Sequence, residues 1–451
     1  MPIRLLIVGH ANTGKTSLIR TLLRSADFGE VADYAGTTRH VEEVSLTING
    51  QEYLTLVDTP GLEDSIGLWD AYQGSKCTDS GLTKLTQLFD APVFADEYSQ
   101  EHKVIRQLSQ CDLILYVIDA RQAPLGKYQD ELSLLALANK PIVPILNFSH
   151  GSDNKLNEWK SLLATRHHHT IIKYDTVAFY FEDEKRLYQA LQSLLPDAYE
   201  EIQRLSEERQ RQAEQRQELG LQQLLRLLID CATYRLVSND YPISRGKREF
   251  FQQHIREREQ GYLNAILTLY DFHQADLQSS ELAVQKEQWQ HDLFAPDTLK
   301  KWGVNSATYA TTGAAIGAGI DILSAGLSLG TATTIGALVG AGWQTGKTYK
   351  DALMTRLTGR CLIRIDHPTL LLLCMRGVAV LRHFHHRGHA SQTPYQLPQG
   401  LEQETLTPPL QQELDRQLSK IGQHLNWYQQ PIDYQHPTIR KLRQVLEQLL
   451  A

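Results

Sequence analysis

Apolar residues in the first part of the chain form short runs of strand length. These runs lie at Ile3–Val8, Val41–Ile48, Glu52–Val57, Leu113–Asp119 and Pro141–Leu146. Each has the length and the β-branched content of a strand. The second and third runs are joined by an Asn-Gly pair, which predicts a two-residue hairpin turn of type I′.

The first apolar run leads directly into a glycine-containing loop. Residues 9–16 read Gly-His-Ala-Asn-Thr-Gly-Lys-Thr, and a segment of helical character follows them. This is the G-x-x-x-x-G-K-[ST] phosphate-binding pattern, placed between a strand and a helix as the pattern requires. Backbone N–H groups of such a loop surround an anion at a helix N-terminus. We expect Lys15 to reach the terminal phosphates and the Thr16 hydroxyl to bind Mg²⁺.

The third apolar run ends in a second motif, Asp58-Thr59-Pro60-Gly61. An aspartate at the carboxyl end of a strand lies at the edge of the sheet where the phosphate loop lies. We expect Asp58 to hold the Mg²⁺ water shell and the Gly61 amide to meet a γ-phosphate. Between the two motifs, the loop at residues 35–40 supplies a hydroxyl for the metal.

The second half of the chain has helical patterns. Residues 196–220 are dense in Glu, Gln and Arg, which predicts a charged helical linker. Leu219–Val237 is rich in leucine, and Arg248–Leu269 carries an apolar stripe at helical spacing. We therefore expect residues 221–451 to form an all-helical effector domain.

A glycine-rich segment at residues 309–343 interrupts this helical half. Its small residues recur at a spacing of four, which lets helices approach closely. Asp321 lies inside the segment and disfavours membrane insertion. We interpret the segment as a tightly packed helical hairpin, and insertion into a membrane is the alternative.

Composition narrows the functional class. The chain has 451 residues, which predicts two to three domains, and a net charge of −7, which argues against a general nucleic-acid binder. Its five cysteines form no C-x-x-C pair, which fits a reducing cytosol. The chain begins with a predicted strand, so we expect no signal peptide and a cytoplasmic location.

The three N-terminal motifs resemble those of the Era/TrmE branch of bacterial translation-factor-related GTPases. The resemblance covers residues 1–195 and implies a P-loop G domain with a mixed six-stranded sheet and helices on both faces. It implies that Thr38 is the switch I threonine and Asp58 the switch II aspartate, both on the metal side with Thr16. The nucleotide-binding residues that it implies are Gly9, Asn12, Thr13, Gly14, Lys15, Thr16, Ser17, Gly61, Asn147 and Phe148.

The base-reading motif departs from this family. The family pattern N-K-x-D is replaced by Asn147-Phe148-Ser149-His150. Phe148 can stack on a purine, but the carboxylate that accepts the guanine N–H bonds is missing. Each unmet buried partner costs about 1–3 kcal/mol, so we expect guanine to be preferred by a reduced margin. Asp153 is a substitute if the loop is reshaped.

Hydrolysis in this family relies on a device other than a glutamine. The residue after the switch II glycine is Leu62, which cannot orient water. In the resembling branch, the asparagine of the phosphate loop helps to hold a K⁺ ion, and Asn12 matches it. The alternative is that Asn12 only suits the left-handed backbone of the loop. The resemblance thus assigns catalytic roles to Lys15, Asn12 and Thr38, while Glu63 and Asp64 are weaker candidates for a general base.

The stretch after Gly61 is unusually long. Residues 62–110 separate the second motif from the next strand, and inserts of this length are usually functional. Because the insert continues from switch II, its conformation should depend on the γ-phosphate. A decorated surface insert is the alternative.

These observations predict a GTP-binding protein that hydrolyses GTP slowly and couples its nucleotide state through switch II to the helical half. Its cofactors would be Mg²⁺ and, through Asn12, K⁺. The expected partners are GTP or GDP and a protein that reads switch II and the helical half. A nucleotide-gated protein at the inner membrane and a nucleotide-binding scaffold with negligible hydrolysis are the alternatives, and a homodimer is left open. The arrangement resembles bacterial fused GTPases whose helical half has no established function.

Overall fold

The computed structural model divides the chain into two compact units. Unit 1 comprises residues 1–215 with 386–392, and unit 2 comprises residues 216–385 with 393–451. The structure describes residues 2–24, 41–149, 154–177, 179–239, 243–272, 284–285, 288–289, 292–294, 320–323, 361–387 and 407–450.

Unit 1 is built on a six-stranded sheet in the order β2-β3-β1-β4-β5-β6. All neighbouring strands are parallel except β2 and β3, which pair antiparallel. The mixed sheet that was predicted is therefore confirmed. The strands are β1 (Ile3–Val8), β2 (Glu42–Ile48), β3 (Gln51–Asp58), β4 (Leu113–Asp119), β5 (Ile142–Asn147) and β6 (Ile172–Lys173).

The turn between β2 and β3 confirms the predicted hairpin. Asn49 and Gly50 have φ angles of 52° and 79°, as a type I′ turn requires at both central positions. The hairpin lies at one edge of the sheet, with β3 paired to β1 on its other side. This pairing brings the end of β3 beside the end of β1.

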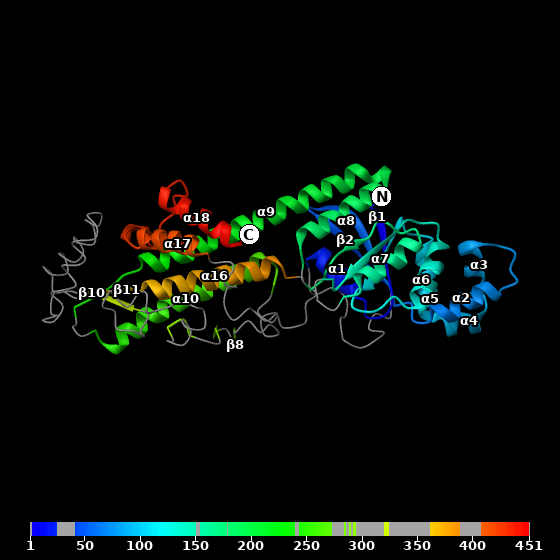
Figure 1. The fold of residues 1–451 in the computed structure, drawn as a ribbon, viewed down its shortest axis with the longest axis horizontal. Helices are drawn as coiled ribbons and strands as arrows, with labels where there is room; N and C mark the ends of the chain where they lie inside the picture. The colour runs from blue at the N-terminus through cyan, green and yellow to red at the C-terminus, as the bar shows by residue number, and fades with distance from the viewer. Residues whose placement is uncertain are drawn as a thin grey trace. The chain divides into compact units, whose positions relative to one another are not determined.

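Helices cover both faces of the sheet, and the side chains of β1 alternate between two hydrophobic cores. Leu5 and Ile7 pack with helices α1, α8 and α9, whereas Leu6 and Val8 pack with helices α2, α3, α5, α6 and α7. Figure 1 shows this α/β unit with its helices labelled. These helices are α1 (Lys15–Leu23), α2 (Ser65–Gly74), α3 (Gly81–Leu88), α5 (Ser99–Leu108), α6 (Gly126–Ala136), α7 (Leu156–Thr165), α8 (Phe181–Leu194) and α9 (Tyr199–Thr233).

The long insert after Gly61 is helical and contributes to the second core. It contains α2 (Ser65–Gly74), α3 (Gly81–Leu88), α4 (Pro92–Glu97) and α5 (Ser99–Leu108). Leu68, Leu85 and Val104 from three of these helices are fully buried. The insert is therefore a packed part of unit 1.

The charged linker is part of one long helix. After the short 3-10 turn η1 (Pro196–Ala198), α9 runs over Tyr199–Thr233. The prediction of a helix at residues 196–220 is confirmed, but its apolar side is packed: Ile202 and Leu205 are fully buried in the core of unit 1. The boundary between the two units falls within this helix.

Unit 2 is predominantly helical, as predicted. Beyond α9 its helices are α10 (Arg245–Leu269), α16 (His367–His385), α17 (Pro408–Ile421) and α18 (Pro437–Leu450), with the short 3-10 turn η3 (Leu425–Trp427). The predicted stripe on α10 is buried at Phe251, Ile255, Tyr262 and Ile266. It packs in one core with α9, α16, α17 and α18.

The expectation that this region is all-helical needs a correction. Strands β10 (Ile320–Leu323), β11 (Cys361–Ile365) and β7 (Leu236–Ser238) form an antiparallel sheet. Strands β8 (Val284–Gln285) and β9 (Gln288–Trp289) form a separate pair. The isoleucine-rich segments Ile320–Leu323 and Cys361–Ile365 satisfy their backbone groups by pairing with each other, which helical periodicity alone does not reveal.

Of the helical hairpin predicted at residues 309–343, the structure describes only residues 320–323, and these form a strand. Residues 320–323, which include Asp321, are extended and paired with β11. The rest of that hairpin, including its glycine pairs, lies outside the described residues. Among the helices in the described part of the chain, none is both long enough and apolar enough to cross a membrane.

Candidate functional site

The phosphate loop connects β1 to α1 with the backbone geometry that the motif requires. Asn12 and Gly14 have φ angles of 60° and 90°, so both occupy the left-handed region. A Cβ at Gly14 would lie 2.2 Å from Asn147 Nδ2, so only glycine fits between the loop and the end of β5. Gly14 is also the N-cap of α1, which aims the helix N-terminus into the loop.

Lys15 is folded back on the loop. Its Nζ donates to Gly9 O at 3.2 Å and to His10 O at 2.9 Å. Burial lowers the pKa of this ammonium group, while Asp58 and Glu131 act in the opposite direction. A buried cation held only by two neutral carbonyls is poised to exchange them for phosphate oxygens.

Thr16 and Asp58, the two residues of the predicted Mg²⁺ site that the structure describes, are hydrogen-bonded to each other. Thr16 Oγ1 donates to Asp58 Oδ2 at 2.6 Å, and Asp58 is fully buried at the end of β3. Within the described residues, no hydrogen-bond partner lies at the second oxygen, Asp58 Oδ1. Burial raises the pKa of Asp58 to about 6, against the hydrogen bond from Thr16 and the charge of Lys15. A buried carboxylate with an unused oxygen beside a hydroxyl has the hard-oxygen chemistry that Mg²⁺ prefers.

Switch II begins tightly against the phosphate loop. Thr59 Oγ1 donates to Ile7 O at 2.7 Å, and Leu62 N donates to Gly9 O at 3.3 Å. A Cβ at Gly61 would lie 2.7 Å from Ala11 N, so this contact also requires glycine. The Gly61 backbone therefore lies beside the loop that would carry the phosphates.

The side chains after Gly61 offer little to a hydrolytic water. Leu62 is fully buried and belongs to the core that contains the insert helices. Asp64 is occupied as the N-cap of α2, because its Oδ1 accepts from Gly67 N at 2.9 Å. Glu63 is exposed and stays a candidate general base.

On the base side, Asn147 braces the loop. Its Nδ2 donates to Thr13 O at 3.0 Å. Its Oδ1 accepts from Thr176 N at 3.0 Å and from Phe148 N at 2.9 Å. Thr176 follows β6, so the segment after the last strand of the sheet contacts the base motif.

Phe148 has an unexpected neighbour, Arg121. The Arg121 guanidinium lies 4.0 Å from the centre of the Phe148 ring, and Asp119 accepts from it through both carboxylate oxygens at 2.9 and 2.8 Å. Phe148 has a positive φ of 55°. The stacked pair forms a flat surface where the family has the lysine side chain.

The remaining predicted residues divide into two groups. Thr13 and Ser17 are buried in the loop and in the first turn of α1, and Asn12 is exposed at the tip of the loop. Thr38, His150 and Asp153 lie outside the described residues. The assignment of Asn12 to K⁺ and of Thr38 to switch I stays a prediction.

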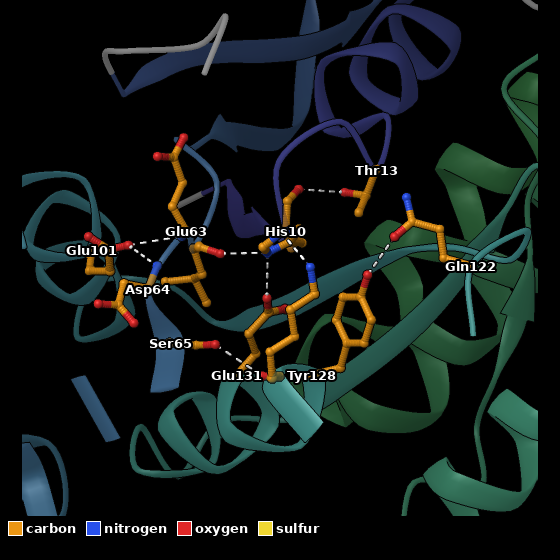
Figure 2. A network of polar contacts seen from close by, with 12 residues as sticks. His10, Thr13, Glu63, Asp64, Ser65, Glu101, Gln122, Tyr128 and Glu131 are labelled. Atoms are coloured by element: carbon orange, nitrogen blue, oxygen red, sulfur yellow. Dashed lines mark hydrogen bonds and ion pairs between the residues drawn. The ribbon is translucent and has the colours of Figure 1, made fainter. Parts of the chain in front are cut away.

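Sequence reasoning missed a polar network around switch II, which Figure 2 shows in close view. It consists of His10 in the phosphate loop, Glu131 on α6 and Glu101 on α5. The only local signal is that Glu101 and Glu131 stand at inward-facing helix positions, where a carboxylate must be paired. The pairing itself joins residues up to 121 positions apart.

Comparisons with known proteins agree with this geometry. Residues 4–148 match the family described as "50S ribosome-binding GTPase", and residues 160–451 match the family described as "Domain of unknown function (DUF3482)". GTPase Der of Chlamydia muridarum is 30% identical over 149 residues. The tRNA modification GTPase MnmE of Petrotoga mobilis is 31% identical over 163 residues. The N-terminal part is thus homologous to these G domains, which confirms the resemblance stated above.

These relatives are longer than this chain, and each matches it over only part of its length. The matched regions cover 32% of this chain and 24% of Der, and 36% of this chain and 29% of MnmE. Among solved structures, Aquifex aeolicus Era bound to GDP.AlF4- is 21% identical, covers 44% of this chain and 58% of that chain, and has a TM-score of 0.32. With so limited an overlap, the assignment of the fold depends on the sheet order and the phosphate loop.

Proposed function

This chain belongs to the DUF3482 family, and we propose that it is a GTP-binding protein that hydrolyses GTP slowly and couples its nucleotide state through switch II to its helical half. The observation that carries the proposal is the pair formed by Thr16 and Asp58. The 2.6 Å hydrogen bond from Thr16 Oγ1 to Asp58 Oδ2 joins the phosphate loop to switch II. Within the described residues, the other buried oxygen of Asp58 has no hydrogen-bond partner.

Thr16 and Asp58, with Thr38 of switch I, would hold Mg²⁺. The ion would neutralise charge on the β- and γ-phosphates when bound. Lys15 would move from Gly9 O and His10 O to the phosphates, and the Gly61 amide would meet the γ-phosphate. Each of these groups faces the same loop in the structure.

Slow hydrolysis follows from the burial of Leu62. A buried aliphatic side chain neither orients a water molecule nor accepts a proton, so Leu62 does not perform the step that glutamine performs at this position in other GTPases. The same observation favours a second function, that of a nucleotide-binding scaffold with negligible hydrolysis. The two functions differ in whether the bound triphosphate turns over.

Guanine is the base that the site supports best, by a reduced margin. Asn147 retains the bracing contacts of the base motif, and Phe148 offers a ring for stacking. A carboxylate that could accept from the guanine edge is not present at position 150. The protein partner, a membrane-associated role, a homodimer and a cytoplasmic location stay predictions of the sequence.

Single-turnover hydrolysis in K⁺ and in Na⁺ tests the catalytic part of the proposal. We expect the wild type to be faster in K⁺ by about tenfold, because a cation at Asn12 would stabilise charge that builds on the phosphates. The variants Asn12→Ala and Asn12→Gly should both lose this difference.

The glycine variant separates the two interpretations of Asn12. Glycine adopts the observed φ of 60° without strain and lacks an amide oxygen. If Asn12→Gly keeps the K⁺ stimulation, Asn12 serves only the backbone. Equal wild-type rates in the two salts would remove K⁺ from the mechanism, and no turnover in either salt would favour the scaffold.

A further inference from the structure

The side chain of His10 links the phosphate loop to switch II. Its Nδ1 lies 2.8 Å from Leu62 O and 3.0 Å from Glu131 Oε1. A carbonyl oxygen and a carboxylate oxygen facing the same nitrogen are both acceptors, so Nδ1 carries the proton and donates to both. The donor that holds the Leu62 carbonyl is thus a side chain of the phosphate loop itself.

The other ring nitrogen fixes the same tautomer. His10 Nε2 lies 2.8 Å from Lys127 Nζ, which donates to its lone pair. The Tyr128 ring packs against the imidazole in a T-shaped arrangement with a centroid distance of 5.8 Å. Side chains of α6 therefore contact both nitrogens and the ring of His10.

Glu131 anchors this arrangement in the core. It is fully buried on α6, and its second oxygen accepts from Tyr116 OH on β4 at 2.6 Å. A buried carboxylate with two side-chain donors has little freedom to move. In Figure 2, Glu131 and His10 lie beside each other below the loop that carries Thr13.

The opposite side of switch II is held by the insert. Glu101 on α5 accepts from Glu63 N at 2.9 Å and from Asp64 N at 3.0 Å. Ser65 Oγ donates to Lys127 O on α6 at 3.0 Å. Residues 62–65 are thus each tied to a neighbouring element by a hydrogen bond, and Figure 2 shows these ties around the loop.

The His10 peptide also meets the phosphate-binding lysine. His10 O accepts from Lys15 Nζ at 2.9 Å and from Thr13 Oγ1 at 3.0 Å. When Lys15 turns to a phosphate, it leaves this carbonyl. A change at the phosphates therefore acts on the residue whose side chain holds Leu62.

We propose that His10 is a positioning residue that holds switch II through its Nδ1–H. When a triphosphate binds and Lys15 turns toward it, His10 transmits this change from Lys15 to Leu62. The second half of this inference rests on the proposed GTP-binding function. The first half concerns the protein without nucleotide and is testable independently.

Two isosteric substitutions separate the two ring nitrogens. Asparagine places an amide nitrogen near the position of Nδ1, and glutamine places one near the position of Nε2. Hydrogen exchange of residues 62–65, measured by mass spectrometry on the full nucleotide-free chain, reports how tightly switch II is held. We expect His10→Gln to accelerate exchange in this segment by about tenfold, because one hydrogen bond to Leu62 O is lost. The exchange rate of His10→Asn should stay within about threefold of the wild type. Ser133→Ala, on the same helix α6 and bonded to Gln129 O, is the matched control and should change nothing in this segment.

Hydrolysis gives the second readout. We expect His10→Gln to lower the single-turnover rate by about tenfold while the Kd of a non-hydrolysable GTP analogue stays within about twofold, because the phosphate contacts remain. His10→Asn should restore the rate. If His10→Gln fails to fold, Glu131→Gln provides the same test, since it removes the charge that faces Nδ1 and keeps the side-chain volume.

The outcomes separate the two proposals. Unchanged exchange in His10→Gln, or equal acceleration in both variants, would overturn the role of His10 whatever the nucleotide chemistry. Accelerated exchange in His10→Gln together with a wild type that neither binds nor hydrolyses GTP would leave the positioning role standing and overturn the proposed function. Normal hydrolysis in His10→Gln would overturn the transmission to Leu62.

Discussion

At the scale of single residues, the site is a set of polar groups whose partners are incomplete without nucleotide. Lys15 is buried against two carbonyl oxygens, and in the part of the chain that the structure describes one buried oxygen of Asp58 has no hydrogen-bond partner. Groups of this kind cost folding free energy, and they are retained where a ligand supplies the missing partner. The ligand implied by this pair is an anion with a divalent cation.

Asp58 makes the nucleotide-free protein sensitive to pH. Its folded-state pKa is about 6, against an ordinary value of 3.8, because burial disfavours the charge. Below both values the carboxyl is protonated in the folded and unfolded states and contributes nothing. As pH rises through this window the unfolded state ionises first, so the wild type should lose on the order of 3 kcal/mol of stability between about pH 4 and pH 7.

The measurement is the pH dependence of denaturation for the wild type and Asp58→Asn. The asparagine variant should lack this pH-dependent contribution. The difference in the free energy of unfolding between the two proteins should therefore change between about pH 4 and pH 7 and be constant above this range. Mg²⁺ with nucleotide should stabilise the wild type above pH 6, where the carboxylate is ionised. A difference that is constant from pH 4 to pH 8 would show that burial does not perturb Asp58.

At the scale of elements, the insert is a structural support of switch II. Its helix α5 places Glu101 in the first turn, where a carboxylate is favoured by the helix dipole, and the side chain is only 4% exposed. From there it accepts two consecutive N–H groups of switch II. The insert thus supplies a fixed carboxylate that accepts from these two N–H groups, which would otherwise donate to solvent.

Removing this carboxylate should release switch II from the insert side. We expect Glu101→Ala to accelerate exchange of the Glu63 and Asp64 amides by about tenfold or more, because two partly buried N–H donors lose their carboxylate acceptor. Glu101→Gln keeps one acceptor oxygen, so its exchange rate should lie between those of Glu101→Ala and the wild type. Glu97→Ala removes an exposed carboxylate at the end of α4 and serves as the control. If Glu101→Ala exchanges like this control, the insert does not hold switch II.

The sequence predicted the elements whose cause is local. The turn at Asn49 and Gly50 follows from two residues that tolerate positive φ, and the phosphate loop follows from its glycines and the flanking strand and helix. The small-residue spacing of residues 309–343 predicts a helical hairpin and no strand, whereas residues 320–323 pair with β11, a partner that lies far away in the sequence. Contacts such as that between His10 and Glu131 join distant residues, and no local pattern encodes them.

At the scale of the whole molecule, α9 belongs to both units. Its first part packs on unit 1, where Arg209 donates to Leu22 O at 2.7 Å at the end of α1. Arg24, which ends α1, pairs with the buried Glu184 at 2.6 Å. In the sequence, α1 precedes the segment that carries Thr38, and α9 continues into unit 2. These two helices are in contact within unit 1. The proposed coupling therefore has a physical connection at α9 as well as at switch II.

The identity of the nucleotide decides what this site does. The phosphate loop, the pair of Thr16 and Asp58, and the homology to Der and MnmE all lead to a purine triphosphate with Mg²⁺. Guanine is inferred from Asn147 despite the loss of the lysine and the aspartate of the base motif. Lys15 is the side chain whose removal affects the phosphates without touching the base.

Isothermal titration of the full chain with GTP and with ATP in Mg²⁺, for the wild type and Lys15→Ala, tests this claim most directly. We expect the wild type to bind GTP about tenfold to a hundredfold more tightly than ATP, a margin smaller than a complete base motif gives. We expect Lys15→Ala to melt like the wild type and to lose triphosphate binding, because the charge that faces the phosphates is gone. Unchanged affinity in Lys15→Ala, or ATP bound as tightly as GTP, would contradict this claim.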